Sequence, residues 1–384
     1  MSNTMFEQRI EALDADSASV AAAFGGDQRV GDHARRGDPR WEQRLLEAQE
    51  FMHDVYTGRR GIHHFVEAMS TSDFPLLFAD SLDRQLYGAY EATPTTWQNY
   101  ARAATVNDFR EVKRFATSGI RNLLTRVGEL AEHPRRSQTE AEYKYAVHKY
   151  EAGFALSFEA MINDDLGAFR RLPQDLAQSA RDSEEDFVTR LYVGPNGPLS
   201  DVYSGPNDNI LAGNPPLSRE ALQAAITKLM KRKDERGNPI QVRAIELVVG
   251  TGLSLAANEI INATEYRAVG PNGDVTIIRG NGIGGNLRVN TNYFIDSVAS
   301  TANADTSWFL FANPNGPRPA LEFGRLRGYE APALYEKIPD MRRLGGAEVP
   351  WSFNHGASEK KVQHIYGGSF VDPKMTIASN GTGS

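Results

Sequence analysis

The segment Gly280–Gly285 has the spacing G-x-G-x-x-G, which in many proteins holds the pyrophosphate of a dinucleotide, and it follows the strand-like residues 274–278. Dinucleotide binding needs a helix that begins at the third glycine, because its first N–H groups must face the phosphates. The next residues, 286–294, are typical of a strand instead. The spacing therefore predicts a glycine-rich hairpin, and a nucleotide-dependent enzyme that uses this loop is the alternative hypothesis.

Three other patterns could carry chemistry, and each lacks a necessary partner. Gly250–Gly252 lies between a buried strand and a helix that Ser254 is expected to cap, but the Gly-Lys-Ser/Thr of a phosphate-binding P-loop is missing. Residues 358–361 match S-x-x-K without its partner motifs. His63 and His64 are adjacent, so their side chains point apart in a helix or a strand. The sequence therefore predicts no catalytic residue, no metal and no cofactor, and a protein that is not an enzyme.

The composition narrows the classes of function further. The 384 residues include no cysteine, which excludes a disulfide framework, a zinc-thiolate or iron-sulfur site and a cysteine nucleophile. With 42 Lys+Arg against 49 Asp+Glu the net charge is -7, which disfavours a protein that reads DNA sequence. No stretch reaches the roughly 18 apolar residues of a membrane-spanning helix, and the start lacks a signal-peptide pattern. We expect a globular protein that is intracellular where it is made.

The first 72 residues indicate an N-terminal arm. Asp38 is expected to cap a helix that begins at Pro39 and carries an apolar stripe on one face. Because the flanking sequence is poor in apolar residues, the stripe needs a surface to cover it, such as another subunit; an ordinary core helix of this chain is an equal alternative. The stripe consists of Trp41, Leu45, Ala48, Met52 and Val55.

Residues 113–153 are predicted to form one long two-limbed excursion. Its middle is polar, and on the return limb Tyr143, Tyr145 and Val147 alternate with other residues as in a strand with two different faces. At about 3.3 Å per residue each limb could reach up to roughly 65 Å, and a two-stranded ribbon alone is marginal in water. The excursion therefore needs neighbouring molecules, and the inter-subunit contacts predicted on it are Tyr143, Tyr145, Val147 and Tyr150.

The apolar period then changes from 2 to 3.6, which predicts a long helix within residues 154–193. Pro173 is expected to kink or divide this helix, because it removes an interior N–H group. The far end carries an acidic cluster that is interpreted as a solvated or partner-facing edge, with Asp182 and Glu185 as predicted inter-subunit contacts. The cluster consists of Asp182, Glu184, Glu185 and Asp186.

Shorter elements are predicted on both sides of this helix. A helix is expected over residues 73–87, with irregular sequence up to about residue 112, and Ser218 is expected to cap a helix that a basic loop, residues 231–237, follows. Pro-Asn-Gly predicts tight turns at 195–197, 271–273 and 314–316. Strands are predicted at 244–249, 275–279, 287–295, 308–311, 320–323 and 363–370.

One stretch, Tyr143–Phe169, makes the sequence recognisable. It reads YKYAVHKYEAGFALSFEAMINDDLGAF, in which a strand runs into the pattern Ser-x-Glu-x-x-x-Asn-Asp-Asp-Leu. This resembles the major capsid proteins of tailed bacteriophages with the Hong Kong 97 type fold, in particular the Mu-like major head subunit branch. Ile245–Gly250 and Gln363–Pro373 support the resemblance, which covers the chain from about Asp73 to its C-terminus.

The resemblance implies a structural protein of the α+β class with the Hong Kong 97 type fold. It implies self-assembly into pentamers and hexamers of an icosahedral shell that encloses double-stranded DNA through loose, non-specific contacts. Portal, scaffold and decoration proteins are further implied partners, no membrane is implied, and the implied location is the virion after assembly in the host cytoplasm. The implied divisions are an arm (1–72), an extended loop (113–153), an axial domain (194–318) and a peripheral domain made of 73–112, the spine helix 154–193 and the β tail 319–384.

The resemblance also bears on covalent crosslinks between subunits, on the arm and on the kind of shell. Some relatives join a lysine of the extended loop to an asparagine of another subunit, and Lys144, Lys149 and Asn354 are available for this. The arm is expected to stay in the shell. A nanocompartment shell protein of the same fold is the alternative to a virion protein.

Overall fold

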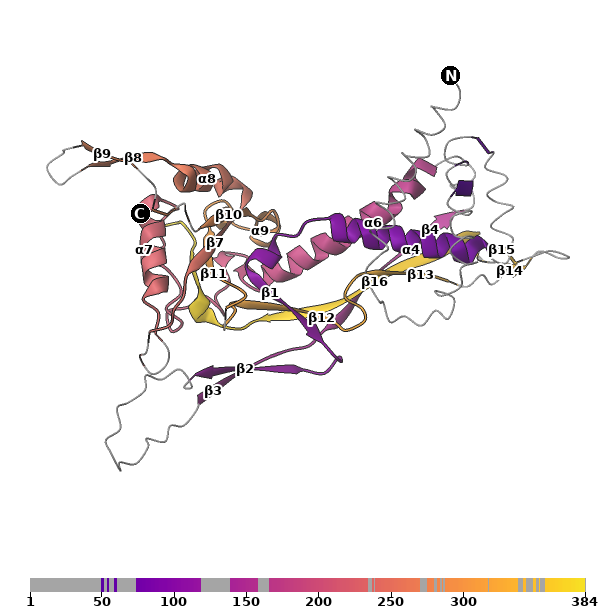
Figure 1. Ribbon diagram of the computed structural model, residues 1–384, viewed down its shortest axis with the longest axis horizontal. Coiled ribbons are helices and arrows are strands. Elements are labelled where there is room, and N and C mark those ends of the chain that lie inside the picture. The colour runs from indigo at the N-terminus through magenta and orange to yellow at the C-terminus, as the bar shows by residue number, and fades with distance from the viewer. Residues whose placement is uncertain are drawn as a thin grey trace, which may run out of the picture. The chain divides into compact units, whose positions relative to one another are not determined.

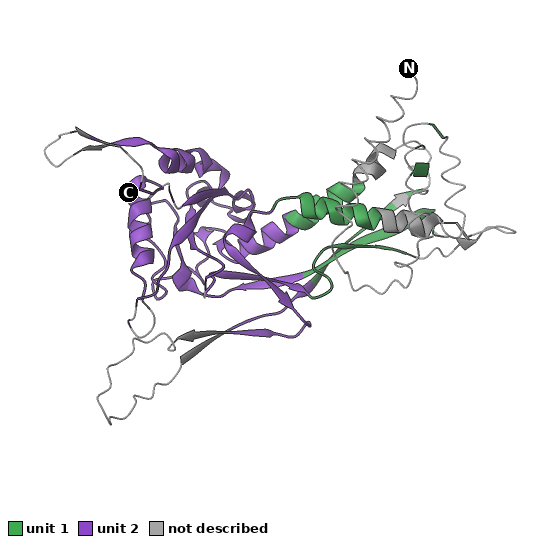
Figure 2. Ribbon diagram, viewed as in Figure 1, with its two compact units in different colours: residues 1–94, 149–181, 327–365 green, residues 95–148, 182–326, 366–384 purple. Residues whose placement is uncertain are grey.

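The computed structural model forms two compact units, between which the chain passes several times (Figure 2). Unit 1 comprises residues 1–94, 149–181 and 327–365, and unit 2 comprises residues 95–148, 182–326 and 366–384. Helices and strands occur in both units, which confirms the α+β class. The residues described are 50–51, 54, 59–60, 74–118, 139–157, 166–233, 237, 239–269, 275–279, 282–283, 285, 287–316, 318–337, 341–342, 348–349, 352 and 356–383.

Among the residues described, unit 1 combines helices with strands (Figure 1). Its helices are α4 (Phe74–Ala92) and the first part of α6 (Leu166–Arg190). Its strands are β4 (His148–Ser157), β13 (Ala333–Glu336), β14 (Met341–Arg342), β15 (Glu348–Val349) and the first part of β16 (Ala357–Phe370). β13 and β4 both pair with β16, and β14 pairs antiparallel with β15.

The core of unit 1 lies where α4 meets α6. Leu86 and Tyr90, four residues apart and so on one face of α4, pack against Ala177 and Ala180 of α6. Arg181 closes this contact, because its Nε donates to the carbonyl oxygen of Tyr90 at 3.0 Å and its guanidinium lies 3.5 Å from the centroid of that ring. The small alanines allow the large side chains of α4 to approach.

Strands of unit 2 form two groups. In the first group β1 (Ala101–Val106) pairs parallel with β12 (Leu321–Leu326), which pairs antiparallel with the end of β16. The second is a four-stranded sheet in the order β10-β7-β11-β17. Its strands are β10 (Arg288–Thr291), β7 (Ala244–Val249), β11 (Trp308–Ala312) and β17 (Thr376–Ser379).

Helices and hairpins complete unit 2. The helices are α7 (Arg219–Met230), α8 (Ser254–Asn262), α9 (Phe294–Val298) and the last part of α6, with 3₁₀ turns η1 (Trp97–Asn99), η2 (Thr251–Leu253), η3 (Ala302–Ala304) and η4 (Pro373–Met375). The antiparallel hairpins are β2 (Val112–Ser118) with β3 (Thr139–Tyr145), β5 (Val193–Gly194) with β6 (Gly197–Pro198), and β8 (Glu265–Val269) with β9 (Val275–Arg279). Gly197 adopts φ +93° in the β5–β6 turn, which confirms the tight turn predicted there.

The predicted cap of α7 is confirmed. The Oγ atom of Ser218 accepts a hydrogen bond from the N–H group of Ala221 at 3.1 Å. Leu222 and Leu229 of the same helix are fully buried in the core of unit 2, and α7 contacts both β7 and β17. The cap therefore fixes where α7 begins, and the apolar face covers the four-stranded sheet.

Three predictions about elements are wrong. Residues 101–106 form β1 rather than irregular sequence. Their pairing partner β12 lies far away in the chain, so no local pattern indicates this strand. The strand β4 continues to Ser157, so the change to helical period comes later than expected. Ser254 is the first residue of α8 and makes no capping bond; its hydroxyl group lies 2.7 Å from that of Thr291.

Two more expectations are corrected within helices and strands. Pro173 lies inside α6 and does not divide it, since one lost backbone hydrogen bond is outweighed by the packing of this helix; a kink at Pro173 stays a prediction. The strand predicted over 287–295 ends earlier: β10 covers Arg288–Thr291, and α9 begins at Phe294.

Candidate inter-subunit surface

The nine predicted contact residues fall into three groups. Trp41, Leu45 and Met52 of the arm lie outside the described residues. Tyr145 and Val147 are 6% and 1% exposed, whereas Tyr143 is half-buried and Tyr150 is 36% exposed. The last two, Asp182 and Glu185, belong to the acidic cluster of α6. Of the six that the structure describes, Tyr143, Tyr150 and Asp182 thus retain surface that a neighbouring subunit could cover.

The hairpin predicted around residues 113–153 is present at its base. β2 and β3 pair in register from Val112 with Tyr145 to Ser118 with Thr139. The residues that join them, 119–138, lie outside the described residues. On the return limb the two predicted faces are confirmed, because Lys144 and His148 are exposed while Tyr145 and Val147 are buried.

The base of the hairpin is tied to β12 by one carboxylate. Glu322, 4% exposed, accepts a hydrogen bond from the hydroxyl of Tyr145 at 2.6 Å and one from the Nε of Arg114 at 2.6 Å. Burial and the bond to Glu322 raise the pKa of Tyr145 above its ordinary value, so this hydroxyl stays protonated and keeps donating. Arg114 belongs to β2 and Tyr145 to β3, so Glu322 holds both limbs.

A pair of glycines makes room for this base. Gly324 of β12 and Gly367 of β16 are direct neighbours in the antiparallel register. A Cβ atom at Gly324 would lie 2.8 Å from the ring of Tyr145, and one at Gly367 would overlap the carbonyl oxygen of Ala146. At Gly367 the chain between β3 and β4 therefore approaches β16 at a distance that only glycine permits, and at Gly324 the ring of Tyr145 fills the space beside β12.

The interpretation of the acidic cluster of α6 as a solvated or partner-facing edge is wrong in part. Glu184 is fully buried and Glu185 is 7% exposed, so neither belongs to a solvated edge. Glu185 accepts hydrogen bonds from the backbone N–H groups of Thr96 and Trp97, the second at 3.1 Å, and one from the hydroxyl of Thr96 at 3.0 Å. Burial raises its pKa, and these bonds oppose the rise. Asp182 and Asp186 remain half-buried.

Large apolar side chains are exposed elsewhere in unit 2, and no sequence pattern indicated them. Leu255 of α8 is 79% exposed and Tyr293, just before α9, is 71% exposed. Met230 at the end of α7 is 60% exposed, and Ile277 of β9 is 57% exposed. These side chains add candidate contact area to that predicted on the hairpin.

The glycine-rich loops do not form nucleotide sites in the part of the chain described. After Gly285 the chain enters β10 rather than a helix, so no helix N-terminus faces Gly280–Gly285. At Gly250–Gly252 the side chain of Asp296 is already in place, since it accepts hydrogen bonds from the N–H group and the hydroxyl of Thr251. The carboxylate of Asp296 would repel a phosphate at this position.

Within the residues described, no helix is both long and apolar enough to cross a membrane. Among the same residues, no group of three or more histidine, aspartate or glutamate side chains is arranged to hold a metal ion.

A buried glutamate in the four-stranded sheet gives a pH-dependent prediction. Glu246 of β7 is 2% exposed, and burial raises its pKa to about 7 although Arg288 on the adjacent strand lowers it. The unfolded chain releases this proton near pH 4.5, so between about pH 4.5 and 7 the folded state binds more protons and the free energy of unfolding falls as pH rises. The expected slope is up to about 1.4 kcal/mol per pH unit.

Urea unfolding at several pH values measures this slope. Glu246→Gln should flatten it, because glutamine does not titrate in this range. Glu220→Gln, on the exposed side of α7, serves as the control and should leave the slope unchanged. An equal slope in all three proteins would contradict the assignment to Glu246.

Comparison with known proteins decides the family. The profile of one family, described as phage capsid protein, matches residues 140–377, which is more than half of the chain. The chain belongs to the phage capsid protein family. This confirms the identification made from residues 143–169, and the protein is a structural, shell-forming major capsid protein of bacteriophage type.

Solved structures similar to the capsid protein come from several shells. The structure from Gordonia phage Cozz is 14% identical, with a TM-score of 0.44 over 75% of this chain and 86% of that one. The procapsid of bacteriophage JBD30 is 13% identical, with a TM-score of 0.39 over 80% and 75%. The virus-like particle from Pyrococcus furiosus is 11% identical, with a TM-score of 0.46 over 79% and 99%. No curated protein sequence matches the chain.

Proposed function

We propose that this capsid protein has the Hong Kong 97 type fold of the Mu-like branch and assembles into pentamers and hexamers of an icosahedral shell around double-stranded DNA. Membership of the phage capsid protein family carries the proposal. The divisions into arm, extended loop, axial domain and peripheral domain describe roles in that assembly, with the boundaries predicted from the sequence.

The hairpin is the element that this function needs most. Its two limbs are in register up to Ser118 and Thr139, and its base is held by Glu322 and by the glycine pair. A firmly held base with 20 further residues, 119–138, supports a loop that reaches a neighbouring subunit. Tyr150, 36% exposed at the start of β4, and Asp182 offer further contact area.

Shortening the hairpin tests the proposal. Because Ser118 and Thr139 are paired, residues 119–138 can be replaced by Asn-Gly, which closes a two-residue hairpin turn. This variant should keep the circular dichroism of the subunit but form free capsomers or aggregates instead of closed shells, as seen by electron microscopy and sedimentation. A second variant that replaces 119–138 with a Gly-Ser segment of equal length separates the loss of length from the loss of specific contacts. Shells of normal size and heat stability from both variants would refute the role of the hairpin.

The contents of purified shells distinguish a virion protein from a nanocompartment. Genome-length DNA that resists nuclease inside the particles supports the capsid of a virus. Particles that carry an enzyme and no nucleic acid would favour the nanocompartment instead.

A further inference from the structure

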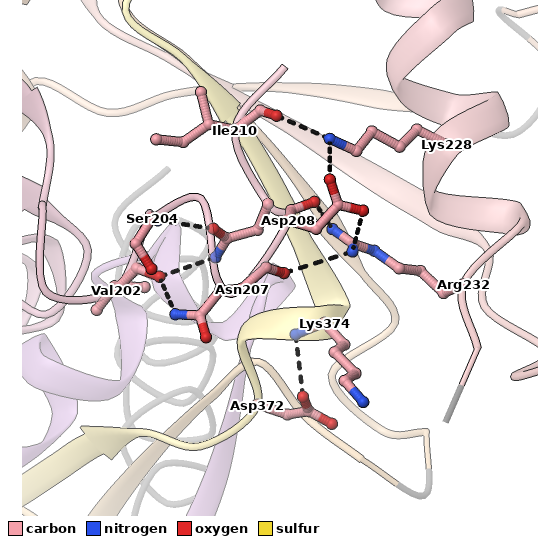
Figure 3. A network of polar contacts seen from close by, with 10 residues as sticks. Val202, Ser204, Asn207, Asp208, Ile210, Lys228, Arg232, Asp372 and Lys374 are labelled. Atoms are coloured by element: carbon pink, nitrogen blue, oxygen red, sulfur yellow. Dashed lines mark hydrogen bonds and ion pairs between the residues drawn. The ribbon is translucent and has the colours of Figure 1, made fainter. Parts of the chain in front are cut away.

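A cavity of about 920 Å³ lies beside α7 in unit 2. Three segments form its walls: the turn 206–208, the exposed side of α7 continuing to Lys233, and Lys374 of η4. Figure 3 shows the side chains at the centre of this group, where Lys228 and Arg232 converge on Asp208. Nothing in the family role derived above uses this cavity.

The walls of the cavity carry an excess of positive charge. Five cationic side chains line it against two carboxylates, Asp208 and Glu220. Lys231 and Lys233 are exposed, and Lys374 is half-buried. Among the residues described, none of these three ammonium groups has a carboxylate within salt-bridge distance, so their charge is available to a ligand. The cations are Lys228, Lys231, Arg232, Lys233 and Lys374.

One of these cations, Arg232, is buried in the wall of the cavity. Arg232 is 7% exposed, and its guanidinium donates to the carbonyl oxygens of Asn207 and Asp208 and to the carboxylate of Asp208 at 3.1 Å. Its Nε is buried without a hydrogen-bond partner among the described residues. The turn that it holds contains Asp208 in the left-handed region, at φ +50°. The cavity thus has a fixed cationic floor.

The carboxylate of Asp208 partly neutralises the positive charge of this floor. Its carboxylate lies 2.7 Å from the Nζ of Lys228 and 3.1 Å from the Nη1 of Arg232, yet its side chain is 68% exposed. An exposed carboxylate on two cations, one of them buried, occupies the position that an external oxyanion would take. Among the described residues that line the cavity, none is an aromatic residue that could stack on a base or a sugar, so charge is the property that they recognise.

We propose that this cavity binds a compact anion that carries several phosphate groups, of which a polyphosphate chain is the simplest form. A volume of about 920 Å³ suits a ligand of this size, and five cations, four on α7 and the residues after it and one on η4, suit several oxyanion groups rather than one. A DNA duplex presents its phosphates on a convex surface, so it cannot reach all three walls of a cavity. Bound anion would join α7, the turn 206–208 and η4.

Titration calorimetry with inorganic tripolyphosphate at low ionic strength tests the proposal on the full-length protein. The triple variant Lys231→Gln, Lys233→Gln, Lys374→Gln should bind about tenfold more weakly or worse, and its affinity should depend less on salt. Asp208→Asn should bind about threefold more tightly, because it removes the competing carboxylate and asparagine tolerates the left-handed backbone. Arg243→Gln, which removes a cation from an exposed position of unit 2 outside the cavity, should stay within about twofold of the parent.

Weaker binding of tripolyphosphate by the triple variant, together with tighter binding by Asp208→Asn, establishes the site. Equal affinities in the triple variant and in Arg243→Gln would overturn it, and so would weaker binding by Asp208→Asn. A double-stranded oligonucleotide forms the second arm of the experiment. Binding of that duplex without binding of tripolyphosphate would show a DNA-contacting surface and overturn the compact anion.

Discussion

Replacing Glu184 by alanine is expected to lower the free energy of unfolding by about 3–5 kcal/mol, because it leaves a cation without its buried counter-ion. Glu184 is fully buried in α6. Both of its carboxylate oxygens lie 3.1 Å from the Nη2 of Arg325, and Oε2 also accepts a hydrogen bond from the Nε1 of Trp97 at 3.1 Å. Alanine would remove this buried carboxylate from Arg325 and leave the buried indole N–H without this acceptor.

Urea unfolding followed by tryptophan fluorescence and circular dichroism measures this loss. Asp186→Ala is the matched control on the same helix, since its pair with Arg190 is exposed and contributes about 0.5 kcal/mol or less. Combining Glu184→Met with Arg325→Met should recover part of the stability, because the double variant removes both charges of this pair together. If Glu184→Ala lowers the free energy of unfolding no more than Asp186→Ala does, the role of this ion pair is contradicted.

Part of this arrangement was readable in the sequence. Ala180, Glu184 and Val188 follow one another at intervals of four residues, so the acidic side chain stands in phase with buried positions of α6. That phase is the signal that the interpretation of a solvated edge overlooked. The partner, Arg325, is 141 residues away in the chain, and no local pattern indicates it.

The same contrast between local and distant information explains the fold predictions. β7, β11, α7 and the β5–β6 turn were predictable because their apolar period, their cap or their turn residues lie within the element. β1 was missed, because only its first and last residues are buried and its partner β12 follows more than 200 residues later. The glycine patterns at 280–285 and 250–252 were not mistaken for nucleotide sites, because the type of the elements around them could be predicted.

The candidate contact surface was predictable only in outline. The alternation around Tyr145 and Val147 correctly predicted two faces, but it did not show that the apolar face is covered by the same chain. The sequence offered Gly367 as one glycine among 34, and its role depends on its direct pairing with Gly324. The basic loop at residues 231–237 was visible, whereas its neighbours Asp208 and Lys374 come together with it only in the fold.

Gly367→Ala is expected to destabilise the capsid protein by about 3 kcal/mol or more, because the added methyl group meets backbone rather than a movable side chain. A Cβ atom there would overlap the carbonyl oxygen of Ala146 and lie 2.9 Å from the Cα of Val147. Gly324→Ala should cost less, about 1–3 kcal/mol, since its closest contacts are side-chain atoms of Tyr145 and Val106, which can shift. Gly282→Ala, with no atom within 4 Å of the new Cβ, is the control and should change stability by about 0.5 kcal/mol or less.

The order of the three glycine variants also tests how the hairpin is positioned for assembly. Because Ala146 and Val147 join β3 to β4, a displaced backbone at Gly367 shifts the base of the hairpin, β2 and β3. Gly367→Ala should therefore reduce the yield of closed shells more than Gly324→Ala does, as counted by electron microscopy at a temperature where both subunits remain folded. Normal shell yield and normal unfolding in Gly367→Ala would show that the strands separate to admit the methyl group, and that the glycine pair does not set the position of the hairpin.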